Sequence, residues 1–293
     1  MYEQNWITEW DIQNIASMGC NVIRLPFWYR NFMSDANGTW IAENPDENPG
    51  FQKLDWLIET AGKYGVYVIL DMHGCPGGQS YDHCTGSPRT CELFVNEIYQ
   101  QAMEKLWIAI ADRYKDNPVV AAYDIMNEAL AFEGEIEDDP RNILYDRMIK
   151  AIRQVDDRHI IAVEGIWTLS VLPDPKEWGW DNVMYEVHTY GETDVETYCR
   201  NLQSYSAEKQ VPVYIGEFSD FKILENCRNL GIHCTSWTYK GTAYAEGDWY
   251  MYYSDRSAAD VYNDPFWLIK MKWGNCLRTQ FLEEQTQVTA YWK

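Results

Sequence analysis

Two short segments decide the fold of this chain: residues 121–128 (AAYDIMNE) and residues 211–218 (VPVYIGEF). Each has the length and the apolar, partly β-branched content of a buried strand. Each also carries a glutamate at or near its end, Glu128 or Glu217. A buried glutamate is costly unless it is paired or used. Two of them on separate strands can face each other across a cleft, as glycoside hydrolysis requires.

Strand-like and helix-like segments alternate along nearly the whole chain. The expected strands are 21–26, 66–71, 119–126, 160–164, 183–187, 211–215 and 232–239. The expected helices are 9–18, 54–64, 92–114, 142–155, 195–209, 224–230 and 265–285. This alternation predicts parallel strands with right-handed crossovers, and seven such units favour a TIM-like (β/α)8 barrel over an open doubly wound sheet. No linker or repeat interrupts the pattern, so we predict one domain over residues 1–293.

The strand count is short by one, because a closed barrel of this kind needs eight strands. The chain begins with a helix that precedes its first recognisable strand, so we infer that the first barrel strand is missing. Unpaired strand edges and exposed apolar surface favour pairing with another segment. We expect either the alternating tail 288–292 (VTAYW) or a second copy of the chain, related by a two-fold axis, to cover the gap.

The overall charge restricts the partners. A net charge of −21, from 24 basic and 45 acidic residues, repels nucleic acid and anionic membranes. The 14 Trp and 21 Tyr serve mainly as core residues, but they also suit a cleft that stacks on sugar rings. No stretch has the length of a membrane-spanning helix, and residues 1–5 lack the basic and apolar regions of a signal peptide.

The eight cysteines permit disulfides without requiring them. Cys75, Cys84 and Cys91 crowd one loop rich in Gly and Pro, where a disulfide can staple the backbone. The same loop contains His83, so a zinc site is conceivable. Its spacing matches no paired Cys-x-x-Cys site, and we therefore do not favour zinc.

Polar or aromatic residues follow nearly every expected strand. In a βα barrel the active site lies at the carboxyl ends of the strands. Any one of these residues has an ordinary structural explanation, but their common place in successive units favours a shared site. They are Arg24, His73, Asn127, Glu128, His188, Tyr190, Glu217 and Trp237.

In their order and spacing, these residues resemble glycoside hydrolase family 5, a family of retaining (β/α)8 glycosidases, over roughly residues 8–273. The resemblance implies that Glu128 is the acid/base and Glu217 the nucleophile, with no cofactor and no metal. It departs from the family at Ala129, where a proline is usual, and in the missing first strand. The proline shapes the backbone and performs no chemistry, so we expect activity to survive its absence.

Charge requirements assign the supporting roles. Glu128 has to be protonated, so we expect burial and the nearby Glu217 to raise its pKa. Arg24 and Tyr190 can keep Glu217 ionised, and Asn127 can donate to the sugar 2-hydroxyl. A retaining mechanism predicts carboxyls about 5–5.5 Å apart.

His73 and His188 can bond to sugar hydroxyls and to the nucleophile. Trp237 offers a ring face to the sugar at the point of cleavage.

The loop 74–80 (GCPGGQS) resembles a loop of glucan-cleaving branches of the family, including exo-acting β-1,3-glucanases. We therefore expect a β-glucan polysaccharide or oligosaccharide as substrate, an endo-β-1,4-glucanase (cellulase) activity first, and an extracellular location. The alternatives are a β-1,3-glucanase, a β-mannanase of the same fold, or an inactive barrel that only binds carbohydrate. A metal-dependent hydrolase would need a His/Asp cluster, whereas the strand-end histidines here are single.

Overall fold

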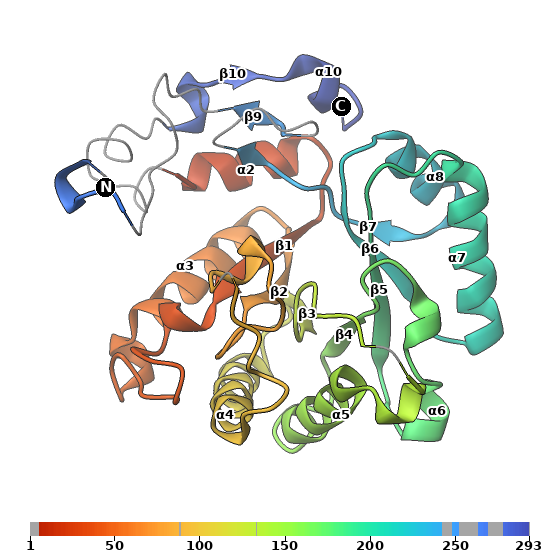
Figure 1. Cartoon of the computed structure of the whole chain (residues 1–293). Helices are drawn as coiled ribbons and strands as arrows, with labels where there is room; N and C mark the ends of the chain where they lie inside the picture. The colour runs from red at the N-terminus through yellow and green to blue at the C-terminus, as the bar shows by residue number, and fades with distance from the viewer. Residues whose placement is uncertain are drawn as a thin grey trace.

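The computed structural model describes residues 6–87, 89–132, 134–241, 248–251, 263–268 and 278–292. Seven parallel strands pair in sequence order to form one curled sheet (Figure 1). They are β1 (Val22–Trp28), β2 (Tyr67–Gly74), β3 (Val120–Asp124), β4 (Ile160–Glu164), β5 (Val183–Thr189), β6 (Val213–Phe218) and β7 (His233–Cys234). The predicted TIM-like alternation of strands and helices is confirmed.

Helices connect the strands and cover the outside of the curled sheet (Figure 1). They are α3 (Pro49–Lys63), α4 (Glu97–Tyr114), α5 (Pro140–Arg153), α6 (Pro175–Trp178), α7 (Val195–Lys209) and α8 (Lys222–Leu230), and α2 (Glu9–Ser17) precedes β1. Their starts follow from local side chains. Asn48, Asn96 and Asp139 each accept a backbone N–H in the first turn of α3, α4 and α5, which satisfies groups that no helix bond can reach.

Two apolar clusters hold the sheet from its two faces. The larger lies between the strands and the outer helices. The smaller lies inside the curl and forms a floor, built from Ile69, Ala122, Ala162, Met184 and Tyr214. Residues two positions further along a strand face the same side. The side chains above this floor therefore also point into the interior, toward the carboxyl ends of the strands.

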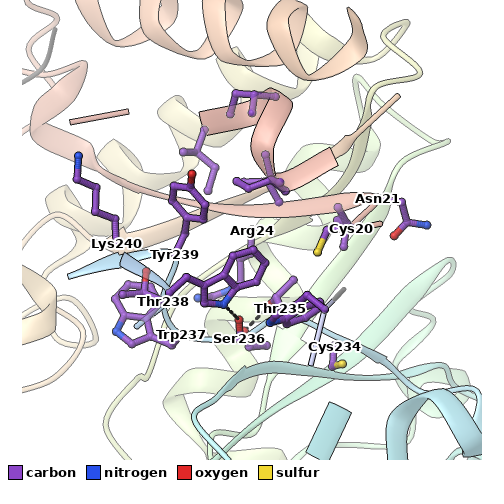
Figure 2. A pocket seen from close by; sticks show the side chains of 18 of the residues that line it. Cys20, Asn21, Arg24, Cys234, Thr235, Ser236, Trp237, Thr238, Tyr239 and Lys240 are labelled. Atoms are coloured by element: carbon purple, nitrogen blue, oxygen red, sulfur yellow. Dashed lines mark hydrogen bonds between the residues drawn. The ribbon is translucent and has the colours of Figure 1, made fainter. Parts of the chain in front are cut away.

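The sheet is open between its first and last strands. β1 pairs with β2 and β7 with β6, and in the described residues no strand pairs with their other edges. A cavity of about 640 Å³ lies along this opening. Figure 2 shows the cavity, with Cys20, Arg24, Cys234 and Trp237 among the residues that line it.

The C-terminal tail does not fill that opening, so the strand predicted for 288–292 is wrong. Residues Thr286–Thr289 form the short helix α10, and the following residues form a turn. Tyr291 stacks on Phe221 of the segment before α8, with ring centroids 5.1 Å apart, and Arg228 donates to the Tyr291 carbonyl at 3.1 Å. The tail borders the opening through Trp292, which lines the cavity and packs on Trp249 with ring centroids 4.9 Å apart.

Two further predictions near the C-terminus need correction. The helix expected over 265–285 is helical at 266–268, but Thr279–Phe281 is a 3-10 turn and Glu283–Glu284 is strand β10; residues 269–277 lie outside the described part. β10 pairs with β9 (Tyr250–Met251), which pairs with β8 (Lys240–Gly241). The strand expected over 232–239 shortens to β7, which has a neighbour on one side alone.

The seven described cysteines carry free thiols, including the three of the Gly/Pro-rich loop; Cys276 lies outside the described residues. No helix in the part of the chain that the structure describes is both long and apolar enough to cross a bilayer.

Candidate active site

Arg24 of β1 lies at the centre of a charged cluster inside the curl. Its guanidinium donates to Glu217 Oε1 at 2.9 Å, to Asn127 Oδ1 at 3.0 Å and to Asp124 Oδ2 at 2.8 Å. Its side chain is 3% exposed. Burial opposes the charge of Arg24, but Asp71, Asp124 and the other surrounding carboxylates hold its pKa well above its usual value. Arg24 therefore joins β1 to four other strands through ion pairs with Asp71, Asp124, Glu186 and Glu217.

Glu217 of β6 has a hydrogen-bond donor on each carboxylate oxygen. Arg24 donates to Oε1, and the Tyr190 hydroxyl donates to Oε2 at 2.7 Å. The residue is 5% exposed. These two hydrogen bonds fix the orientation of the Glu217 carboxylate. The structure thus brings Arg24, Tyr190 and Glu217 together as the sequence predicted.

Glu128 follows β3 with a backbone φ of +42°, in the left-handed region that non-glycine residues rarely adopt. His188 Nδ1 lies 2.9 Å from its Oε1, and the Cys84 thiol donates to its Oε2 at 3.6 Å. Burial and then the charge of Glu128 raise the pKa of Cys84 to about 12, so the thiol keeps its proton. The sequence suggested a disulfide or a zinc site for the loop of Cys84, and neither hypothesis included this contact with Glu128.

The predicted increase in the pKa of Glu128 is wrong for the unliganded site. Burial raises this pKa, but the hydrogen bond and charge of His188, together with His73, lower it below its usual value. The sequence argument considered burial and Glu217. It could not place the buried cation beside Glu128, because His188 lies on another strand.

His188 of β5 is 1% exposed, and four carboxylates surround it. Besides Glu128, its nitrogens lie 3.4 Å from Glu164, 3.5 Å from Glu186 and 3.7 Å from Glu217. Burial lowers the pKa of His188, but these carboxylates, Glu164 first, raise it well above its usual value. His188 thus contacts both predicted catalytic glutamates, at 2.9 Å from Glu128 and 3.7 Å from Glu217, and its contact with sugar hydroxyls stays a prediction.

The two glutamates and His188 lie within one small space. Ligand atoms of Glu128, His188 and Glu217 are all within 4.8 Å of one another, and among the described side chains this is the sole such group of three or more. Metals bind neutral histidine. The surrounding carboxylates raise the pKa of His188, which favours the imidazolium over the neutral ring that binds a metal ion.

Aromatic rings lie beside the predicted catalytic residues, at the carboxyl ends of the strands. His73 stacks on Trp237 with centroids 5.3 Å apart, and its Nδ1 lies 2.7 Å from Asp71 Oδ2. Trp167, which follows β4, packs edge-on against Tyr190 at 6.4 Å and is 58% exposed. Sequence reasoning missed Trp167, although it follows a strand end. An exposed ring at this edge can stack on a sugar.

An acidic layer, which the sequence analysis also missed, lies next to the apolar floor, on its side toward the carboxyl ends of the strands. Asp71 pairs in register with Asp124, and Glu164 with Glu186. Each of the four is 1% exposed or less. Burial and then the charge of Glu186 raise the pKa of Asp124, and burial raises the pKa of Glu164 to about 8. Asp71 and Glu186 each lie two residues before a strand-end histidine, a same-face spacing that could have revealed them.

Gly216, which precedes the predicted nucleophile Glu217, has to be a glycine because the acidic layer leaves no room for a side chain. A Cβ on Gly216 would lie 1.6 Å from Glu186 Oε1. A residue with a side chain would therefore displace the Glu186 carboxylate from its place beside Arg24, where Oε1 lies 3.2 Å from Nε.

With this geometry in view, the comparisons with known proteins are decisive about the family. The model of the family described as Cellulase (glycosyl hydrolase family 5) matches residues 1–242. The chain belongs to glycoside hydrolase family 5.

Curated relatives carry several glycosidase names. A β-xylosidase of Phanerodontia chrysosporium is 32% identical over 192 residues, which are 63% of this chain and 38% of that protein. Endoglucanase C of Acetivibrio thermocellus is 31% identical over 160 residues, or 55% of this chain and 43% of the relative. The chain thus spans about two fifths of the length of these relatives.

Solved structures agree on the fold. An endoglucanase of Pseudomonas stutzeri matches with a TM-score of 0.62 at 19% identity, over 80% of this chain and 78% of the other. An endogalactoceramidase matches with a TM-score of 0.66 at 17% identity, over 79% and 65%. At these identities the likeness supports the barrel architecture and leaves the substrate open.

Proposed function

We propose that this glycoside hydrolase is a retaining β-glucanase, with endo-β-1,4-glucan as its first substrate, Glu217 as nucleophile and Glu128 as acid/base. One observation carries the proposal. Glu128 follows β3 and Glu217 lies on β6, and one carboxylate oxygen of each lies within 4.8 Å of the other. Retaining enzymes place their carboxyls roughly 5–5.5 Å apart, whereas inverting enzymes need about 6.5–9.5 Å to admit a water.

In the first step, a carboxylate oxygen of Glu217 forms a bond to the anomeric carbon while the bond to the leaving oxygen breaks. Glu128 gives its proton to that oxygen, and the alcohol leaves. In the second step, Glu128 takes a proton from water, which attacks the anomeric carbon and releases Glu217. Arg24 and Tyr190 hold Glu217 by one hydrogen bond on each oxygen and so stabilise it as a carboxylate.

The first step needs a proton on Glu128, although His188 lowers its pKa in the unliganded site. The Glu128 side chain is 21% exposed there. A bound sugar would exclude water from this remaining surface, and desolvation raises the pKa of a carboxyl. His188, which lies 2.9 Å from Glu128, holds a proton near the same oxygen.

The names of the relatives support a glucan but do not select a linkage. They include an endoglucanase, a cellodextrinase and probable endo-1,6-β-glucosidases, beside the β-xylosidase. The substrate, the absence of a required cofactor and an extracellular location are therefore parts of this proposal.

A substrate panel tests it. Reducing-sugar release should be measured on carboxymethylcellulose, barley β-glucan, laminarin, pustulan, mannan and an aryl β-xyloside, with and without EDTA. We expect the highest rate on a β-1,4-linked glucan, unaffected by EDTA, with the β-anomer as first product by proton NMR. The α-anomer as first product would contradict retention. Glucan binding without any sugar release would identify a barrel that only binds carbohydrate.

A further inference from the structure

Glu164 lies directly behind Glu128. It ends β4, and its side chain is fully buried. Its Oε2 accepts the backbone N–H of Glu128 at 2.6 Å. The Tyr145 hydroxyl lies 3.2 Å from the Glu164 carbonyl and 3.4 Å from the Met126 carbonyl, so it connects the two strand ends. Glu164 therefore contacts Glu128 from a fixed position.

The backbone of Glu128 needs such a contact. A φ of +42° is costly for a residue with a side chain, and it persists only where the surroundings enforce it. The N–H of Glu128 has no partner in a strand ladder, because β3 ends at Asp124. Without the Glu164 oxygen, this donor would lose its protein partner, and the backbone could relax and carry the side chain with it.

A second contact reaches the Glu128 side chain. Glu164 Oε1 lies 3.4 Å from His188 Nδ1, the atom that lies 2.9 Å from Glu128 Oε1. Glu164 thus acts on Glu128 at its backbone directly and at its carboxyl through His188.

We propose that Glu164 is a positioning residue for the general acid, which holds Glu128 in its pose by accepting its backbone N–H. This inference rests on the proposed role of Glu128. The accepting oxygen is the essential feature, and a negative charge is not required. Glutamine keeps a side-chain oxygen that can accept this N–H at 2.6 Å, so it can replace glutamate at this position.

The test compares Glu164→Gln with Glu164→Leu, which keeps the volume but removes both oxygens. The substrates are aryl β-cellobiosides with a poor leaving group (phenol) and a good one (2,4-dinitrophenol). A residue that acts through the general acid affects the phenyl substrate most, because dinitrophenolate leaves without protonation. We expect Glu164→Leu to lower kcat/KM about 100-fold on the phenyl substrate and less than about 5-fold on the dinitrophenyl substrate. Glu164→Gln should stay within about 5-fold of wild type on both.

Glu186→Gln is the matched control. Glu186 is the register partner of Glu164 in the same buried layer, and it also lies near His188, 3.5 Å from Nε2. It differs from Glu164 in that no bond to the Glu128 backbone is found for it. Any loss in Glu186→Gln should be equal for the two leaving groups. If Glu164→Leu is folded by circular dichroism and loses equally on both substrates, its role is merely structural and the proposal is wrong. Equal defects in Glu164→Gln and Glu164→Leu would also overturn it.

Two further variants keep the result interpretable. If Glu164→Leu does not fold, Glu164→Asp withdraws the carboxylate from the N–H by one methylene and takes its place in the same comparison, with the same expected dependence on leaving group. Glu128→Ala tests the proposed function separately. If Glu128→Ala shows no dependence on leaving group, the acid/base assignment fails. If Glu128→Ala shows this dependence but neither Glu164→Leu nor Glu164→Asp does, the inference about Glu164 fails and the acid/base assignment stands.

Discussion

The arc from β2 to β6 and the opening between β1 and β7 obey different constraints. In the arc every strand has a neighbour on each side, and register alone brings acidic side chains into pairs such as Asp71–Asp124 and Glu164–Glu186. At the opening each strand has one neighbour, and β7 pairs with β6 through two residues. The residues at the strand ends are therefore positioned by pairing with neighbouring strands. Closure of the sheet between β1 and β7 would instead require a segment outside these seven strands.

Arg24 connects the two regions. It lies on β1, lines the cavity at the opening and still reaches Glu217 on β6. Four ion pairs with the arc, to Asp71, Asp124, Glu186 and Glu217, hold it there. We therefore expect Arg24, Glu128 and Glu217 to keep their arrangement even when no further strand closes the opening between β1 and β7.

The largest effect should come from the arc. Glu217→Gln removes the nucleophile but retains a side chain of the same size between Arg24 and Tyr190. We expect kcat to fall by about 10⁴-fold or more, because an amide cannot form the glycosyl ester. Turnover of the preferred glucan measures this, and circular dichroism should be unchanged. Near wild-type turnover would disprove the assignment of the nucleophile.

A smaller and selective effect is expected for Glu128→Gln. The amide cannot donate the proton that a poor leaving group needs, so kcat/KM on the phenyl cellobioside should fall by about 10²–10³-fold. On the dinitrophenyl cellobioside, the rate of the first step should change little. Pre-steady-state measurement separates that step from hydrolysis of the glycosyl ester. An equal loss on both substrates would place Glu128 outside acid catalysis.

The same division explains how much the sequence could predict. The strand-end residues were predictable because each lies beside a recognisable apolar strand, and pairing in sequence order brings them together. The environment of His188 was not predictable from the sequence. Its partners Glu164 and Glu186 come from two strands, and either glutamate alone could equally be a structural residue. The tail was mispredicted because alternation in VTAYW suits a strand, yet Tyr291 and Trp292 find aromatic partners on Phe221.

A third prediction concerns the assembly of two chains at the opening between β1 and β7. The strand edges that lack a partner among the described residues, together with the cavity, favour association of two copies, while the charge of −21 on each chain opposes it. We expect light scattering at low micromolar concentration to give the mass of a dimer, more completely at high salt, because salt screens the repulsion.

Two matched variants locate the contact. Ile232→Glu adds a charge to the lining of the cavity, and Val95→Glu adds the same charge where the side chain is 85% exposed, at the start of α4. We expect Ile232→Glu to be monomeric and Val95→Glu to associate as the wild type does. A wild-type chain that is monomeric and active at all salt concentrations would show that the opening needs no cover.

The smallest effect, on stability against pH, returns to the acidic layer. Burial raises the pKa of Glu164 from 4.5 to about 8 and that of Asp248 from 3.8 to about 6. The folded chain therefore holds more protons than the unfolded chain between these values. Stability falls as pH rises wherever the folded state binds more protons. His188, whose carboxylate neighbours raise its pKa, acts in the same direction above pH 6.5, its ordinary value. We expect Tm to decline by a few degrees, about 3–6 °C, from pH 5 to pH 8.

Other carboxyls limit stability on the acid side. Asp55 and Asp156 are partly desolvated, but their hydrogen bonds, from Arg113 and Tyr114 to Asp55 and from backbone N–H groups to Asp156, lower their pKa values. Their stabilisation is present above about pH 3.8 and is lost below it, so the highest Tm should lie near pH 5. Glu164→Gln removes the proton that the folded state gains at that site. Thermal melts of this variant should decline less from pH 5 to pH 8 than those of the wild type, and Glu59→Gln, at an exposed position, should retain the wild-type slope. An unchanged slope in Glu164→Gln would mean that this carboxyl is ionised in the folded protein at neutral pH. The imidazolium of His188 would then be neutralised by a charged Glu164 as well as by Glu128.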